Sequence, residues 1–452
     1  MLTLVFLRAA YWQVVKGESL AIEADKQHFY RLEVPANRGI ISSQDLLTLV
    51  ANRQSYTLYA NLTQIKESPE EIASKLTPIV LDSNPQIATT SAEKDVFLDS
   101  LKNKLSLPQI VWVKLLSGMP VTVKEKLDSL KLNGLSFVSE PARDYPEASM
   151  AAQLLGFVGE DNQGGKKGYF GVEGYYNKDL EGKSGWLMEE KDAFQRPILL
   201  GTTTNQEKVD GSDLILTIDS GVQLFVEKYL KEGIANWGAV GGTAIVMDPR
   251  SGDVLAAASF PNYDPANASL YPSSIFKDPL IADFFEPGSI IKPLIMAAAI
   301  NESKVTPQTQ CDDCSGPTVI GAYSIHTFNN AYHPRTTMLE TLINSDNTGM
   351  VFVGRTLGFP NLYRYMNLYG FSQKTGIDLE GENSSALRPI EQWYPIDQAT
   401  VAFGQGIAVT SIQMVRAFSA LANGGKMPTP RIVKAIISHG QKRDLIRPQL
   451  VQ

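Results

Sequence analysis

The chain has 452 residues, enough for two or three domains, and 43% of its residues are hydrophobic, as in an ordinary globular protein. Its formal net charge of −7 disfavours nucleic acid as a partner. The 4 histidines and 2 cysteines show no grouping typical of a zinc site, so the sequence predicts no metal and no cofactor.

The first seven residues are apolar, and Arg8 then interrupts the run. About 20 apolar residues are needed to span a bilayer, and this stretch is far shorter. It is either a short core helix or the outer end of a membrane anchor. Tyr11 and Trp12 suit a membrane interface.

From residue 21 to about 207, short strand-like runs alternate with charged helical ones. We expect strands at 31–35 and 56–60, helices at 69–76 and 92–105, and a glycine-rich loop or hairpin tip at 161–168.

The composition changes near residue 210. Residues 214–219 predict a strand that ends in a helix cap, and 222–234 have helical periodicity. Residues 242–258 predict a hairpin with an Asp-Pro-Arg-Ser-Gly-Asp turn, and several helices follow it. Strand pairs followed by helices indicate an α+β domain.

Cys311 and Cys314 form a C-x-x-C pair, which can be a redox motif, half a zinc site or a local disulfide. There is no second pair and no βαβ pattern around it. We therefore favour a structural loop, reduced or bridged.

A serine followed three positions later by a lysine occurs at three places: Ser91–Lys94, Ser274–Lys277 and Ser289–Lys292. Only the third follows a Pro-Gly break and precedes an apolar run, 293–300, that predicts a buried helix. The other two are predicted to be exposed serines with solvated lysines.

At the start of a helix, Ser289 and Lys292 would share one face, a turn apart. A desolvated amine has a lowered pKa and can accept the hydroxyl proton, which makes a nucleophile without histidine. The helix N-terminus favours the developing alkoxide.

A serine nucleophile also needs a proton relay and a group that holds the substrate amide. Ser345 and Asn347 are candidates for these roles, although a Ser-x-Asn triplet is also common as a helix cap or turn. Lys374-Thr375-Gly376 is a candidate for a third element of such sites, a Lys-Thr-Gly strand, but its position and flanking residues predict a loop with a solvated Lys374.

Motifs along nearly the whole chain occur in the order typical of one family. They are Arg38-Gly39-Ile40-Ile41, Arg143-Asp144-Tyr145-Pro146, Gly156-Phe157-Val158-Gly159, Gly171-Val172-Glu173, residues 180–185, 216–219 and 247–249, Glu286-Pro287-Gly288-Ser289 with Lys292, Ser345-Asp346-Asn347, residues 371–382, Gly404-Gln405-Gly406, Val409-Thr410 and Gln413. With these motifs the chain resembles the class B penicillin-binding proteins, the monofunctional D,D-transpeptidases of bacterial cell-wall synthesis.

This resemblance implies an α+β multidomain fold. Residues 1–18 would be the remnant of a membrane anchor, 19–210 a pedestal or dimerisation domain, and 211–452 a transpeptidase domain with an antiparallel sheet and flanking helices. Two departures stand out. Ser42-Ser43-Gln44-Asp45 replaces the family's Asp-Arg-x-Gly turn, and the expected Lys-Thr-Gly strand does not occur before Gln452. On this comparison both ends are expected to be truncated.

The resemblance also implies a function. Ser289 would attack the D-Ala-D-Ala bond of a peptidoglycan stem peptide, with Lys292 as base, Ser345 as proton relay and Asn347 as substrate clamp. β-Lactams would acylate the same serine. A membrane-embedded glycosyltransferase and other wall-synthesis proteins would be partners, and a single-pass anchor in the bacterial inner membrane would place the catalytic domain on the extracytoplasmic side. The alternatives are a serine D,D-carboxypeptidase or β-lactamase, and a non-catalytic scaffold of the wall-synthesis complex.

Overall fold

The computed structural model describes residues 2–17, 29–83, 90–108, 110–162, 164–190 and 203–445. The chain forms two compact units, and each is discontinuous in sequence. Unit 1 comprises Met1–Ile40, Ala51–Asp144 and Lys178–Ser212, and unit 2 comprises Ile41–Val50, Tyr145–Asn177 and Asp213–Gln452. The domain boundaries expected at residues 19 and 211 stay predictions.

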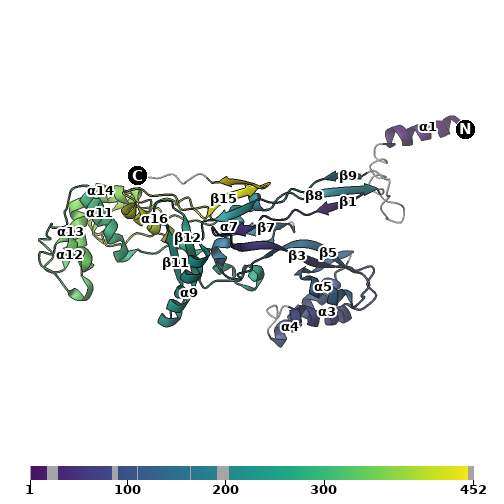
Figure 1. The fold of residues 1–452 in the computed structure, drawn as a ribbon, viewed down its shortest axis with the longest axis horizontal. Helices are drawn as coiled ribbons and strands as arrows, with labels where there is room; N and C mark the ends of the chain where they lie inside the picture. The colour runs from purple at the N-terminus through teal and green to yellow at the C-terminus, as the bar shows by residue number, and fades with distance from the viewer. Residues whose placement is uncertain are drawn as a thin grey trace. The chain divides into compact units, whose positions relative to one another are not determined.

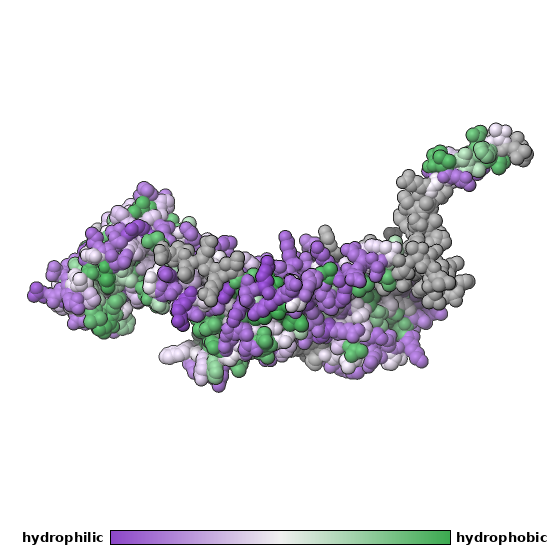
Figure 2. Space-filling model, turned by 45° about the horizontal axis from the view of Figure 1, so that its top comes forward, coloured by the Kyte–Doolittle hydropathy of each residue, from purple (hydrophilic) through white to green (hydrophobic). Residues whose placement is uncertain are grey.

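The N-terminal segment of unit 1 is helical, with α1 (Leu2–Ala10) followed by the π-helix η1 (Tyr11–Val15). Val5, Phe6 and Leu7 are each more than 60% exposed, and Figure 2 shows apolar side chains on the surface of α1. The structure therefore does not support a core helix here. Among the described helices, none has the length and apolar character needed to cross a membrane.

The main core of unit 1 lies between strands and three helices. From Ala51 onward, β3 (Thr48–Asn61) pairs antiparallel with both β5 (Leu135–Asp144) and β4 (Trp112–Met119). Helices α3 (Pro69–Ser83), α4 (Ser91–Leu105) and α5 (Val121–Asp128) bury apolar residues in the same core as β3 and β4. The strand predicted at 56–60 and the helices predicted at 69–76 and 92–105 are confirmed.

Local sequence explains where these helices begin. Thr90 and Glu93 form a capping box, which satisfies free N–H groups at the start of α4. In α3, Ile72, Leu76 and Val80 recur at helical spacing and are buried. A separate sheet of unit 1 has the order β1 (Phe29–Val34), β8 (Gly185–Glu190), β9 (Thr203–Gln206), which confirms the strand predicted at 31–35.

In unit 2, β10 (Asp213–Leu216) pairs antiparallel with β15 (Val433–Ser438) and parallel with β2 (Ile41–Ser42). β15 also pairs with β16 (Gln441–Asp444). Asp219 caps α9 (Ser220–Trp237) by accepting a hydrogen bond from the Val222 N–H, as the strand-then-cap pattern predicted. The glycine-rich turn joins β6 (Phe157–Glu160) to β7 (Lys166–Tyr169), so it is the predicted hairpin tip.

The hairpin predicted at 242–258 is also present. β11 (Gly242–Met247) and β12 (Val254–Phe260) pair antiparallel, with Gly242 opposite Phe260, and α9 packs against both strands. Between the strands, Gly252 has a φ of +77°, which its missing Cβ permits.

A group of helices follows the hairpin in unit 2 (Figure 1). Its elements are α10 (Pro279–Ala282), η5 (Gly288–Ile291), α11 (Lys292–Asn301), α12 (Met338–Ile343), α13 (Asn347–Leu357), α14 (Phe359–Leu368), α15 (Pro395–Val401) and α16 (Ser411–Ala422). α11 lies at the centre of their shared core, where Leu294, Ile295 and Ala298 are fully buried. The helix predicted at 293–300 and the α+β class are therefore confirmed.

Candidate active site

Ser289 and Lys292 lie at the junction of η5 and α11. Side chains at positions i and i+3 of a 3₁₀ turn are nearly eclipsed, which favours the predicted shared face. The Ser289 side chain is exposed, whereas Lys292 is only 2% exposed. No hydrogen bond joins the Ser289 hydroxyl to Lys292 within the described residues. The pair thus consists of an accessible hydroxyl and a buried amine.

The turn before Ser289 is held by a second loop, residues 404–409. Phe285 and Val409 exchange two backbone hydrogen bonds, and the Gly288 N–H donates to the Gly404 carbonyl at 2.9 Å. The Gly406 N–H donates to the Glu286 carboxylate at 2.9 Å. A Cβ on Gly404 would lie 2.1 Å from the Gly288 oxygen, so this close approach requires glycine. We call residues 285–288 and 404–409 the nucleophile clamp.

Ser345 lies in a tight connection between α12 and α13. Thr337 and Glu340 form a capping box that begins α12. Asp346 caps α13 by accepting hydrogen bonds from the Thr348 and Gly349 N–H groups. Ser345, between the two helices, has a φ of +52°, an uncommon left-handed conformation for a residue with a side chain.

Lys292 reaches this connection from α11. Its Nζ donates to the Ser345 carbonyl at 2.6 Å, to the Ser345 Oγ at 3.1 Å and to the Asn347 Oδ1 at 2.8 Å. An ammonium has three donors, so these acceptors match its hydrogen-bonding capacity. The structure therefore brings three of the four predicted site residues into direct contact, and Ser289 is three positions from the lysine at their centre.

The environment of Lys292 favours its neutral form. Burial lowers the pKa of Lys292 to about 8, and the nearby negative charge of Asp346 opposes this effect. A lysine with a pKa near 8 is partly unprotonated at neutral pH, as a general base must be.

Both ends of the Asn347 side-chain amide are engaged. Its Oδ1 accepts from Lys292, and its Nδ2 donates to the His326 carbonyl at 3.0 Å. An amide oxygen has a second lone pair and an amide nitrogen a second hydrogen, so one further hydrogen bond can form at each end.

The other candidate motifs lie elsewhere. The serine and lysine of Ser91–Lys94 and of Ser274–Lys277 are exposed, as predicted. The Lys374-Thr375-Gly376 triplet forms a loop, also as predicted, with Lys374 exposed and Glu382 accepting hydrogen bonds from Thr375 and Gly376.

Cys311 and Cys314 form a disulfide, so neither sulfur is available as a thiolate ligand for a metal. The Cys311 N–H donates to the Thr336 carbonyl, next to the residue that caps α12. This agrees with the prediction of a structural loop.

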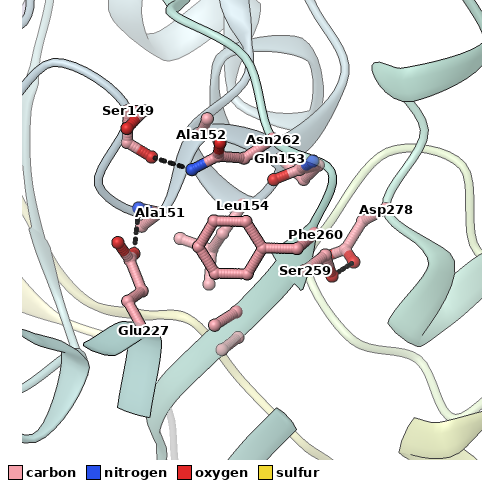
Figure 3. Close-up of a pocket in the computed structure, with 12 residues that line it drawn as sticks. Ser149, Ala151, Ala152, Gln153, Leu154, Glu227, Ser259, Phe260, Asn262 and Asp278 are labelled. Atoms are coloured by element: carbon pink, nitrogen blue, oxygen red, sulfur yellow. Dashed lines mark hydrogen bonds between the residues drawn. The ribbon is translucent and has the colours of Figure 1, made fainter. Parts of the chain in front are cut away.

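A small cavity lies next to β12 and is lined by Glu227, Asp278 and residues 151–154 among others (Figure 3). The Ala151 N–H donates to Glu227, and Ser259 donates to Asp278. Burial raises the pKa of Asp278 to about 6. The cavity has a volume of about 10 Å³, room for a single water, so it is not a substrate site.

Sequence reasoning missed two parts of this site. The nucleophile clamp joins residues far apart in sequence, and no local pattern predicts it. Asp346 stands in the sequence as the centre of the Ser345-Asp346-Asn347 motif, and an Asp before a helix is also an N-cap signal, which the structure shows it to be.

Two family descriptions match the chain. The "Penicillin-binding Protein dimerisation domain" matches residues 33–216, and the "Penicillin binding protein transpeptidase domain" matches residues 242–450.

Two curated relatives match most of the chain. The chain is 32% identical over 439 residues to Stage V sporulation protein D of Bacillus subtilis, covering 96% of this chain and 65% of that protein. It is 27% identical over 428 residues to Peptidoglycan D,D-transpeptidase FtsI of Escherichia coli, covering 94% of this chain and 69% of FtsI.

Solved structures share the fold. Penicillin Binding Protein 2X from Streptococcus thermophilus matches with a TM-score of 0.68 at 24% identity, covering 93% of this chain and 63% of that one. A peptidoglycan synthetase from Bifidobacterium adolescentis matches with a TM-score of 0.66 at 25% identity, covering 93% and 78% respectively. The chain therefore belongs to the class B penicillin-binding proteins.

Proposed function

We propose that this protein is a D,D-transpeptidase that cross-links peptidoglycan stem peptides through an acyl-enzyme on Ser289. The observation that carries this proposal is the position of Lys292, a buried amine with a lowered pKa, in hydrogen-bond contact with Ser345 and Asn347. Its place three residues after an exposed serine gives a nucleophile and a base.

In the first half-reaction, the Ser289 Oγ attacks the carbonyl carbon of the penultimate D-alanine, and neutral Lys292 takes the hydroxyl proton. The C–N bond to the terminal D-alanine breaks. Ser345, hydrogen-bonded to Lys292, passes a proton to the leaving amine. The products are an ester on Ser289 and free D-alanine.

In the second half-reaction, an amino group of a neighbouring stem peptide attacks this ester. A new amide bond forms, the ester C–O bond breaks, and Ser289 recovers its proton. Asn347 holds the backbone amide of the donor peptide through the hydrogen-bonding capacity that Lys292 and His326 leave free. A β-lactam would acylate Ser289 by the same first step, because its ring presents a strained amide.

We also propose an extracytoplasmic location, next to the membrane. The exposed apolar side chains of α1, together with Tyr11 and Trp12, suit an anchor and its interface. The Cys311–Cys314 disulfide suits an oxidising compartment. A membrane-embedded glycosyltransferase and other wall-synthesis proteins would be the partners there.

Labelling with a fluorescent penicillin tests the chemistry. We expect labelling of the wild-type protein, none of Ser289→Ala and slow labelling of Lys292→Ala. Lys374→Ala, the matched control in a Lys-Thr-Gly loop, should label like the wild type. Equal labelling of Ser289→Ala and the wild type would contradict the role of Ser289.

A product assay separates transfer from hydrolysis. With a stem-peptide thioester or pentapeptide and an added D-amino acid, a transpeptidase forms the exchanged peptide. If only the hydrolysed peptide acid is released, the protein is a carboxypeptidase. If a folded protein turns over neither substrate, the non-catalytic scaffold is favoured.

A further inference from the structure

The carboxylate of Asp346 is only half satisfied by the helix that it caps. Its Oδ1 accepts from the Thr348 N–H, the Thr348 hydroxyl and the Gly349 N–H. Its Oδ2 has no hydrogen-bond partner among the described residues, although Asp346 is only 2% exposed. A buried carboxylate oxygen without a partner is costly, so a group that compensates its charge is expected nearby.

His333 lies next to this oxygen. Its Nδ1 lies 3.6 Å from the Asp346 Oδ2, which is long for a hydrogen bond and within reach of an ion pair. The imidazole is 45% exposed, so it connects the buried carboxylate to solvent.

The surrounding structure holds His333 in this place. The Thr336 N–H donates to the His333 carbonyl, and the buried Thr336 carbonyl accepts from Cys311 of the disulfide loop. The ring therefore comes from a turn that is closed by one hydrogen bond and anchored to the disulfide loop at Thr336.

Asp346 also acts on Lys292, since its negative charge favours the lysine's protonated form. Any group that withdraws charge from Asp346 therefore favours the neutral amine at Lys292. Glu340 is a further charged group near His333. Its pKa is lowered chiefly by hydrogen bonds from Thr337 and also by His333.

We propose that His333 is a positioning residue that acts through Asp346 to set the basicity of Lys292. The link runs from His333 through Asp346 to Lys292, and only Lys292, three positions after Ser289, is proposed to exchange a proton with the serine. This inference rests on the proposed function for its catalytic meaning, but the electrostatic link itself can be measured without catalysis.

The direct test is NMR titration of the protein with ¹³C-labelled lysine side chains, with the Lys292 signal assigned by its loss in Lys292→Arg. We expect His333→Arg to lower the titration midpoint of Lys292 by about half a pH unit or more, because a permanent cation neutralises Asp346 and repels the ammonium. His333→Ala should raise it, because Asp346 then loses its neighbouring imidazole and pulls more strongly on the ammonium.

Two controls make the test specific. His439→Ala, in the turn between β15 and β16, should leave the midpoint unchanged. In an Asp346→Asn background, which keeps the helix cap, His333→Ala should leave the midpoint unchanged to within about 0.2 unit, and His333→Arg should shift it less than it does beside Asp346, because only its direct repulsion of the ammonium is left. Identical midpoints in the wild type, His333→Ala and His333→Arg would overturn the proposal, and so would shifts of the same size with and without Asp346.

The rate of penicillin labelling against pH, measured on the same variants, adds the catalytic readout. Its midpoint should move with that of Lys292. If the His333 variants show the NMR shifts but penicillin does not label Ser289 of the wild type, the proposed function fails while the electrostatic link stands. If labelling occurs and no shift is seen, only the role of His333 fails.

Discussion

The Nζ of Lys292 donates a hydrogen bond of 2.6 Å to the backbone carbonyl of Ser345, 53 residues further along the chain. Ser345 has a left-handed backbone, with φ at +52°. The amine is thus held by the main chain of Ser345 and touches its hydroxyl at the same time. Holding the Lys292 amine and relaying a proton, the role proposed for the Ser345 hydroxyl, are therefore separable properties of one residue.

Substitution of Ser345 should separate these two properties. Ser345→Ala and Ser345→Gly both keep the carbonyl and lose the hydroxyl. We expect acylation by penicillin to fall by about 10²-fold or more in both, the size typical of a lost acid–base group. The free energy of unfolding should stay within about 1 kcal/mol of the wild type, and Ser345→Gly should be the less destabilised of the two, because glycine adopts positive φ without strain. Denaturant unfolding and stopped-flow labelling measure the two effects. A fully active Ser345→Gly would exclude the hydroxyl as a relay.

The pH dependence of acylation should report Lys292. With its pKa lowered to about 8, the neutral fraction increases as pH rises, so the rate should climb and level off above about pH 8. Stability should change in the same direction. The folded pKa lies below the unfolded value of 10.5, so burial of the ammonium costs stability below about pH 8, and this cost disappears as pH rises from 8 toward 10.5. A rate that falls between pH 6 and 8 would contradict the role of Lys292 as base.

The nucleophile clamp predicts a specific effect of Gly404→Ala. The new Cβ would lie 2.1 Å from the Gly288 oxygen, so the turn that carries Ser289 must move. We expect a loss of about 10²-fold in the acylation rate, since a displacement of 1 Å can have this effect.

The matched control is Gly424→Ala. Gly424 also has a positive φ, +58°, but open space lies around its Cβ position. It should lose about 1 kcal/mol of stability and keep its acylation rate. Equal acylation by both variants would show that the clamp does not position Ser289.

Asp278 should limit stability at neutral pH. Burial raises its pKa to about 6, so the folded state favours the protonated acid, and stability falls as pH rises from about 4 to 6. Asp278→Asn keeps an oxygen that can accept from Ser259 and from the Leu280 N–H. We expect this variant to gain about 1 to 3 kcal/mol at pH 7 and to show a flatter pH profile. Thermal unfolding at pH 4.5 and 7 tests this, and a variant less stable than the wild type at pH 7 would contradict it.

Much of the fold was predictable because its signals are local. The hairpin β11–β12 follows from two apolar runs around an Asp-Pro-Arg-Ser-Gly-Asp turn, and α11 follows from the apolar residues after Pro293. The discontinuous units were not predictable, since residues 41–50 and 145–177 join unit 2 through contacts that have no local signature.

In the candidate site, too, some features have local sequence signals and others depend on contacts between distant residues. The apolar run after Ser289 distinguishes its Ser-x-x-Lys pair, with a buried lysine, from the two exposed pairs. Glu382 accepts hydrogen bonds from Thr375 and Gly376 and so holds the Lys374-Thr375-Gly376 triplet as a loop. The left-handed backbone of Ser345 and the approach of His333 to Asp346 depend on tertiary structure, so no sequence pattern predicts them.

The most direct test of the central claim is to find the atom that carries the acyl group. The protein is treated with penicillin, digested, and its peptides are mapped by tandem mass spectrometry. The account predicts a penicilloyl mass on Ser289 and its absence from Ser289→Ala. An adduct on Ser345 or another residue, with Ser289 unmodified, would contradict it.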